Sequence, residues 1–246
     1  MSRTVVVTGG AKGIGRAVVE KFSALGDDVL ALGRDEAALN RLTGLAGVRA
    51  AVCDVTDEDA VNRVFAALGD VDVLVNNAGI AESAPLARTT LESWLAHFDV
   101  NVTAPFLCMR AVVPRMKARK SGAIVTVAST AGRIGVPYTS AYTASKHGAV
   151  GLTRAVASEV AGSGVRVNAV CPTFVRTELT QRAIARIVET TGRSEAESED
   201  ALAKQSPLGR LLEPEEVADA VVFLASPAAA SINGQALVID GGGIQS

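Results

Sequence analysis

The chain has 246 residues, of which 48% are apolar and 20% charged, and its formal net charge is −2 at pH 7. This length can bury a large core, and the apolar content is too high for a disordered chain. The near-neutral charge balance argues against nucleic acid or an anionic membrane as a partner. No run of 18 apolar residues predicts a membrane span, and the N-terminus lacks a signal-peptide pattern.

The first residues already alternate between strand-like and helical patterns. Val5–Val7 is a continuous Val run, typical of a strand buried on both faces. A helix with apolar residues at helical spacing is predicted from Gly13 to Leu25, where Gly26 ends it. Further strands are predicted at 28–32, 48–52, 71–75, 123–127, 165–170 and 236–239. Further helices are predicted at 36–42, 57–68 (capped by Thr56), 90–117 (continuous or interrupted), 142–160, within 177–204, and from Pro214 to 224.

Strand and helix alternate about seven times with short connections, and we find no linker, repeat or low-complexity block. The pattern predicts an α/β fold in which residues 1–246 form a single doubly wound Rossmann-type domain. Its sheet is expected to have about seven parallel strands with helices on both faces. The acidic run at 192–200 is predicted to be a solvated loop, with part of a mobile lid (about 177–205) as the alternative.

A glycine-rich turn, TGGAKGIG, joins the first strand to the first helix. Gly9, Gly13 and Gly15 follow a G-x-x-x-G-x-G spacing, which differs from the common G-x-G-x-x-G. Glycines allow a tight turn and a close approach of the backbone to a pyrophosphate. Free N–H groups at the helix N-terminus favour negative charge. A turn that binds nothing is the alternative interpretation.

The end of the second strand carries Gly33 and Arg34 where an NAD site usually places a carboxylate. A guanidinium suits a 2′-phosphate by charge and geometry, and Lys12 in the glycine turn adds a second positive charge. This pattern favours NADP(H) over NAD(H). Asp35 and Glu36, which follow directly, argue the other way unless they serve as acidic N-terminal residues of the next helix.

Two more strand ends carry candidate binding residues. Asp54 can accept a hydrogen bond from an adenine amino group, or it can be a turn residue. Asn76-Asn77-Ala78-Gly79 follows the fourth strand, where small residues and amides allow close approach of a cofactor. An ordinary turn is the alternative there, because Asn and Gly favour turns.

Ser129 follows the fifth strand, and Tyr142 and Lys146 lie four positions apart on the helix after it. Residues at i and i+4 share one helix face. A nearby ammonium is expected to lower the pKa of the phenol toward values useful for acid–base work. The serine hydroxyl can hold a carbonyl or alcohol oxygen beside the phenol. Without further context, a Tyr and a Lys stacked on a surface helix would explain the same spacing.

Together these motifs resemble the short-chain dehydrogenase/reductase family in its short single-domain form. The resemblance rests on TGGAKGIG, NNAG, Asn101, Ser129, YTASK (142–146) and the segment 172–177, and it covers essentially the whole chain. YTASKHGAVGLTRA and NAVCP are similar to the subgroup of 3-ketoacyl-thioester reductases, polyketide ketoreductases and 3-hydroxybutyrate dehydrogenases.

The resemblance implies a role for each matching residue. Tyr142 is the proton donor in reduction or the base in oxidation, and Lys146 lowers its pKa and holds the nicotinamide ribose. Ser129 orients the substrate oxygen, and Asn101 positions a water that links Lys146 to solvent. The implied cofactor-binding residues are Gly9, Lys12, Gly13, Ile14, Gly15, Arg34, Asp54, Val55, Asn77, Ala78, Gly79, Tyr142, Lys146, Pro172, Val175 and Thr177.

The expected activity is hydride transfer between a nicotinamide cofactor, NADPH in preference, and a ketone or secondary alcohol such as a 3-ketoacyl thioester. An NAD-dependent secondary alcohol or 3-hydroxy acid dehydrogenase is one alternative. A non-catalytic NADP-sensing regulator is another, although such proteins are expected to lose the Tyr or the Lys. One departure from the family pattern is Thr173, where Gly is usual. The β-branched residue resists angles that Gly allows.

The remaining expectations concern metal, assembly and compartment. His97 and His147 lack metal-ligand spacing, so no metal is expected, and His147 is interpreted as a packing or surface residue. Arg133 and Arg176 flank the site and can meet an anionic substrate or lie in solvent. The resemblance implies a homotetramer built by helices near 99–118 and 142–160. Three scattered cysteines predict reduced thiols in a cytoplasmic protein.

Overall fold

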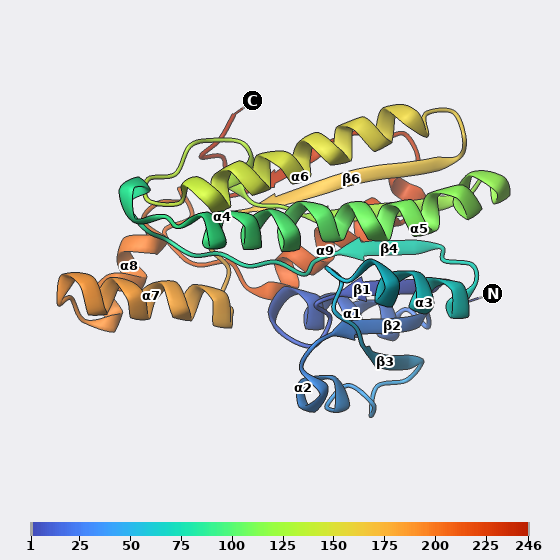
Figure 1. Cartoon of the computed structure of the whole chain (residues 1–246), viewed down its shortest axis with the longest axis horizontal. Helices are drawn as coiled ribbons and strands as arrows, with labels where there is room; N and C mark the ends of the chain where they lie inside the picture. Colours follow the sequence, from blue (N-terminus) through green and yellow to red (C-terminus); the bar gives the residue numbers. More distant parts are fainter. Residues whose placement is uncertain (1, 246) are drawn as a thin grey trace.

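A seven-stranded parallel sheet runs through the centre of the molecule (Figure 1). The computed structural model describes residues 2–245, and over this range the strand order is β3-β2-β1-β4-β5-β6-β7. The predicted doubly wound α/β fold is thereby confirmed. The strands are β1 Thr4–Thr8, β2 Asp28–Gly33, β3 Val48–Val52, β4 Val73–Asn76, β5 Gly122–Val127, β6 Val165–Pro172 and β7 Ala236–Ile239.

Helices cover both faces of the sheet, with α3, α5 and α6 on one side and α1, α2 and α9 on the other (Figure 1). Successive strand residues point to opposite faces, so Val5 and Val7 pack under α1 while Val6 packs under α5. Such doubly buried strands need apolar residues at every position, which explains the Val-rich runs. The helices are α1 Gly13–Ala24, α2 Glu36–Asn40, α3 Glu58–Leu68, α4 Leu91–Phe98, α5 Ala104–Arg119, α6 Ser140–Glu159, α7 Glu178–Thr191, α8 Glu195–Ala203 and α9 Pro214–Ala225.

The long helical region is interrupted between α4 and α5. Residues Asp99–Thr103 form a π-helical segment, whose wider turn carries the buried Asn101. π segments occur mostly as single turns inside α-helices and frequently at functional sites. The interruption therefore falls on the residue that the family resemblance had singled out.

Two local predictions were wrong. The acidic run at 192–200 is not a loop, because α8 begins within it. Ser194 caps this helix through a capping box with Glu197, a signal present in the sequence as S-x-x-E. Thr56 does not cap α3. Asp57 does, and its carboxylate accepts from the amides of Asp59 and Ala60.

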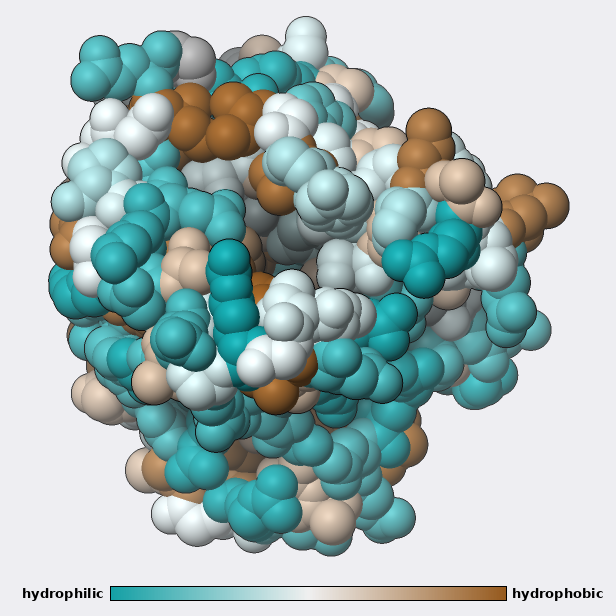
Figure 2. Space-filling view, turned by 90° about the vertical axis from the view of Figure 1, so that its left-hand side faces the viewer, coloured by the Kyte–Doolittle hydropathy of each residue, from teal (hydrophilic) through white to brown (hydrophobic). Residues whose placement is uncertain are grey.

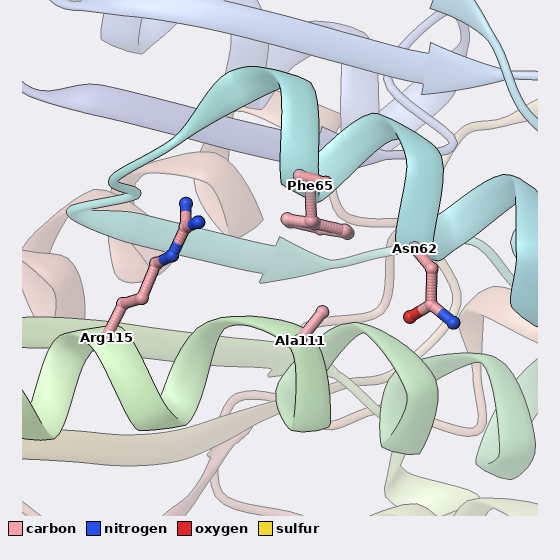
Figure 3. A pocket seen from close by; sticks show the side chains of 5 residues that line it. Asn62, Phe65, Ala111 and Arg115 are labelled. Carbon is pink, nitrogen blue, oxygen red and sulfur yellow. The ribbon is translucent and has the colours of Figure 1, made fainter.

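The carboxyl ends of all seven strands lie at one edge of the sheet, and the chain reverses its winding direction between β1 and β4. Ligands of open α/β sheets bind at such a switch point. Two pockets lie outside this switch point. One, of about 290 Å³, lies between α3 and α5 and is lined by Phe65, Asn62, Ala66, Ala111 and Arg115 (Figure 3). The other, of about 390 Å³, lies beside α8 and Arg176.

Within residues 2–245, none of the helices has the length and apolar character needed to span a bilayer.

Candidate active site

The face that carries the strand ends is hollowed near its centre, and both hydrophobic and hydrophilic residues surround the hollow (Figure 2). The loops that follow β1, β4, β5 and β6 all leave the sheet at this edge. They carry the glycine turn, Asn77–Gly79, Ser129 and the segment 173–177. The topology thus gathers four sequence motifs that are far apart along the chain.

The glycine turn is tightly packed against the end of β4. Gly9 and Gly13 have φ values of +63° and +51°, where a side chain would be strained. A Cβ on Gly15 would lie 2.2 Å from the Gly9 oxygen and 2.4 Å from Asn77 Nδ2, so only glycine fits. Asn77 Nδ2 donates to the carbonyls of Thr8 (2.9 Å) and Gly9 (3.1 Å), which ties the two strand ends together.

The N-terminus of α1 fits a pyrophosphate. Its N-cap residue, Lys12, makes no side-chain capping bond, and no acidic residue lies in the first turn. The first N–H groups of the helix are therefore left for an anion, which the helix dipole also favours. Ile14 and Val55, also predicted to bind the cofactor, have side chains that pack mainly into the two hydrophobic cores.

Both predicted cations lie near the end of β2, and each is close to a carboxylate. Lys12 Nζ lies 2.9 Å from Asp35 and 3.4 Å from Glu178 of α7. Hydrogen bonding to Lys12 lowers the pKa of Asp35, and the same bond raises the pKa of Lys12. Arg34 is largely exposed and lies 3.7 Å from Asp54.

Asp54 and Asp35 also hold the local backbone. One oxygen of Asp54 accepts from the amide and the hydroxyl of Thr56, so the turn alternative applies to that oxygen. Asp35 caps α2 by accepting from the Ala38 amide. Each carboxylate thus has a structural role besides its contact with a cation.

The Ser129 side chain lies close enough to the Tyr142 phenol to lower its pKa. Ser129 lies two residues after the end of β5, and its hydroxyl accepts from the Ala131 amide at 3.1 Å. Lys146 lies one turn after Tyr142 on α6 and is only 6% exposed. Its Nζ donates to the Val127 carbonyl at 3.0 Å and lies 5.8 Å from the centre of the Tyr142 ring. The three residues predicted from their spacing therefore meet.

The expected lowering of the Tyr142 pKa is not seen in the protein alone. Burial raises the pKa of Tyr142, and the nearby Ser129 side chain offsets part of that rise. Burial also lowers the pKa of Lys146 to about 8. The reason is that a low-dielectric surrounding disfavours the charged form of both groups. Tyr142 is consequently a neutral phenol at pH 7.

Asn101 holds the chain that follows β4. Its amide group donates to the Ile80 carbonyl (3.0 Å) and to Ser145 Oγ (2.9 Å), and its oxygen accepts from the Ile80 amide (3.0 Å). A Cβ on Gly79 would lie 3.2 Å from the Asn101 oxygen and 3.4 Å from Lys146 Nζ. Asn101 therefore lies beside Lys146, with both amide protons bound to protein. The water-positioning role stays a prediction.

The segment after β6 reaches back over the glycine turn. Pro172 ends β6, and Val175 is buried against Leu212. Thr177 caps α7, and a Cβ on Gly13 would lie 3.0 Å from its methyl group. Thr173 has an ordinary backbone conformation, because Lys120 and Tyr138 are the non-glycine residues with positive φ within 2–245. The family's usual glycine is not needed at this position for its backbone freedom.

Comparison with known proteins identifies the family. A family model described as enoyl-(acyl carrier protein) reductase matches residues 9–243. The chain is 40% identical to D-threitol dehydrogenase of Mycolicibacterium smegmatis, covering 98% of this chain and 92% of the relative. The chain belongs to the short-chain dehydrogenase/reductase family. It is therefore an oxidoreductase that transfers hydride between a nicotinamide cofactor and a ketone or secondary alcohol.

Two further relatives of this dehydrogenase/reductase support the ketoreductase resemblance. The 3-oxoacyl-[acyl-carrier-protein] reductase of Thermotoga maritima is 39% identical, covering 98% of this chain and 97% of the relative. The structure of an actinorhodin polyketide ketoreductase variant with NADPH superposes with a TM-score of 0.93 at 35% identity. That match covers 98% of this chain and 97% of the other.

The described part of the enzyme shows no cluster of potential metal ligands. Among residues 2–245, no group of three or more His, Cys, Asp or Glu side chains is arranged to hold a metal ion. His97, which sequence reasoning set aside, lies fully buried beside Tyr142. Its apolar neighbours in the sequence gave no sign of this position.

The buried ammonium of Lys146 predicts a pH-dependent stability. Because its pKa of about 8 lies below the ordinary 10.5, the unfolded chain binds more protons between these values. Burial therefore costs stability fully below pH 8, and the cost disappears as pH rises toward 10.5. The difference corresponds to about 3 kcal/mol.

Lys146→Met should raise the free energy of unfolding at pH 7, measured by denaturant titration. Its advantage over the wild type should shrink from pH 8 to pH 10, and an advantage constant with pH would contradict this account.

Proposed function

We propose that the enzyme reduces a carbonyl group with Tyr142 as the proton donor. The observation that carries the proposal is the meeting of Ser129, Tyr142 and Lys146 at the sheet edge, where the Ser129 hydroxyl acts on the Tyr142 phenol and Lys146 is buried behind the ring. A donor must be protonated before it can act, and Tyr142, whose pKa burial raises above the ordinary 10, is protonated at pH 7.

The residues of the site have distinct tasks. Tyr142 delivers its proton to the substrate oxygen, and the Ser129 hydroxyl orients that oxygen beside the phenol. Lys146 places a positive charge behind the ring, and Asn101 fixes the chain on which Gly79 approaches Lys146. The glycine turn and α1 would hold the cofactor's pyrophosphate, while Asn77–Gly79 would lie by its ribose and Pro172–Thr177 by its nicotinamide. When bound, the nicotinamide supplies the hydride.

Tyr142→Phe tests this assignment. The variant lacks the proton that reduction requires, so turnover of a ketone panel should fall by about a hundredfold or more. NADPH binding, followed by cofactor fluorescence, should remain close to that of the wild type. Tyr138→Phe is the matched control, because Tyr138 is the other tyrosine of the chain and is exposed. Wild-type turnover in Tyr142→Phe would remove the proposed mechanism.

We propose NADPH as the preferred cofactor, with NADH as the alternative. Lys12 and Arg34 support this preference, because both cations lie near the end of β2 and Arg34 is largely exposed. Asp35 opposes this preference, because its carboxylate lies 2.9 Å from Lys12. The balance between these charges sets the selectivity between the two cofactors.

Two substitutions measure that balance. Arg34→Ala should weaken the binding of NADPH by about tenfold or more, because a charge-assisted hydrogen bond to the 2′-phosphate is lost. The binding of NADH, which lacks that phosphate, should be nearly unchanged. Asp35→Asn should shift selectivity toward NADPH. Its amide oxygen can still cap α2, so the change removes charge without removing the cap. Apparent KM values for both cofactors provide the measurement, and equal effects on both would exclude a 2′-phosphate site.

For the substrate we propose a small ketone or secondary alcohol, with a 3-ketoacyl thioester as one candidate. Arg176 is paired with Glu199 (2.9 Å) and Glu213 (3.1 Å), so its charge is already compensated in the protein. This weakens a role for Arg176 in binding the phosphates of an acyl thioester. A panel of ketones, polyols and acyl thioesters, each tested with both cofactors, distinguishes these substrate classes and the alternative NAD-dependent dehydrogenase.

We also propose that residues 1–246 form one domain, in which about 177–205 act as a lid. We further propose that the protein is a homotetramer and is located in the cytoplasm. Exposed Leu91, Leu95 and Phe106 on α4 and α5 support an interface there. Three separate, buried thiols are consistent with a reducing compartment.

The assembly is tested by light scattering in solution. The expected mass is four times the 25.2 kDa of one chain. Phe106→Arg should lower it, because a charge would replace an apolar side chain in the interface. A wild-type mass equal to one chain would contradict the proposal.

A further inference from the structure

One face of the helical region at α4 carries three polar residues at a spacing of four. Ser93, His97 and Asn101 lie in one line along the helix. All three contact the segment Gly79–Glu82, which leaves the end of β4. Asn101 binds both the amide and the carbonyl of Ile80. Ser93 Oγ donates to the Glu82 carboxylate at 3.0 Å.

His97 completes this line. Its Nε2 lies 3.1 Å from the Glu82 amide, which can only donate, so Nε2 accepts. Its Nδ1 lies 2.7 Å from the Ser93 carbonyl, which can only accept, so Nδ1 carries the proton. The two partners together require a neutral imidazole in the Nδ1–H tautomer. A second ring proton would face the Glu82 N–H donor to donor.

The His97 ring also reaches the candidate catalytic tyrosine. It is fully buried, and its centre lies 6.4 Å from that of the Tyr142 ring in an edge-on arrangement. The Gly79–Glu82 segment that it holds begins next to Lys146 and continues to Ala84. The Ala84 amide then donates to the Tyr138 carbonyl in the loop before α6. His97 thus contacts both the segment beside Lys146 and the phenol ring.

We propose that His97 is a positioning residue, which as a neutral imidazole fixes the Gly79–Glu82 segment and the Tyr142 ring for proton transfer. The inference rests on the proposed role of Tyr142. An apolar side chain could fill the same volume, but it would leave the Glu82 amide without an acceptor. The segment would then shift relative to Tyr142 and Lys146, and small displacements at a reacting centre reduce turnover strongly.

Paired substitutions separate the hydrogen bond from packing. His97→Leu should lower kcat by about tenfold to a hundredfold, because the Gly79–Glu82 segment and the Tyr142 ring lose a common support. His97→Gln should recover most of the loss, because its side-chain oxygen can accept from the Glu82 amide. The same Leu substitution at His147, the other histidine, should leave kcat unchanged.

A nuclear magnetic resonance measurement tests the tautomer without any turnover. In uniformly ¹⁵N-labelled wild-type protein at pH 7, multiple-bond ¹H–¹⁵N spectra should show His97 as Nδ1–H, with Nε2 unprotonated. The chain has two histidines, so a spectrum of His147→Gln assigns the signals. An imidazolium or an Nε2–H tautomer at His97 would overturn the proposal.

The outcomes also separate this inference from the proposed mechanism. If Tyr142→Phe retains turnover, the mechanism fails while the His97 tautomer is unaffected. If the tautomer is as expected but folded His97→Leu keeps wild-type kcat, the positioning role fails and the mechanism stands. Thermal unfolding establishes whether that variant is folded. Should it not fold, a kcat for folded His97→Gln more than about tenfold below wild type would count against the role.

Discussion

A single ammonium group buried in the protein sets the arrangement of the site. Lys146 is 6% exposed, and no carboxylate in the described residues forms an ion pair with it. A buried charge of this kind is expensive unless it is hydrogen-bonded. The Val127 carbonyl at the end of β5 provides one acceptor, so the position of the charge is tied to a sheet strand. This costly charge lies beside the phenol of Tyr142, the proposed proton donor.

The sheet makes this arrangement possible because parallel strands end together. Thr8 and Asn77 connect the ends of β1 and β4, and Val127 belongs to the neighbouring strand β5. The turns proposed to bind the cofactor and the proposed acid–base groups consequently share one support, which holds them more precisely than independent loops would. Helix α7 is joined to the same support through Lys12 and Glu178.

Much of this could be predicted from the sequence, because it depends on spacing and residue type. Val runs, turn glycines and the Tyr142–Lys146 pair have local signatures that survive without coordinates. The rest depends on three-dimensional surroundings. The direction of the Tyr142 pKa reflects burial by distant elements, which outweighs the opposing effect of Ser129. His97 was unremarkable because its partners, Glu82 and Tyr142, lie 15 and 45 positions away. Helix α8 differs, since its capping box was present in the sequence and was outweighed by the acidic composition.

The π segment at Asp99–Thr103 has a consequence for helical phase. Such a segment corresponds to one residue inserted into a continuous α-helix, so α4 and α5 are out of register with one another. Removing a single residue there would rotate α4 by about 100° about its axis relative to α5. Ser93 and His97 would then point away from Glu82, while α5 kept its packing on the sheet. The inserted residue therefore lets α5 pack on the sheet while α4 directs Ser93 and His97 toward Glu82.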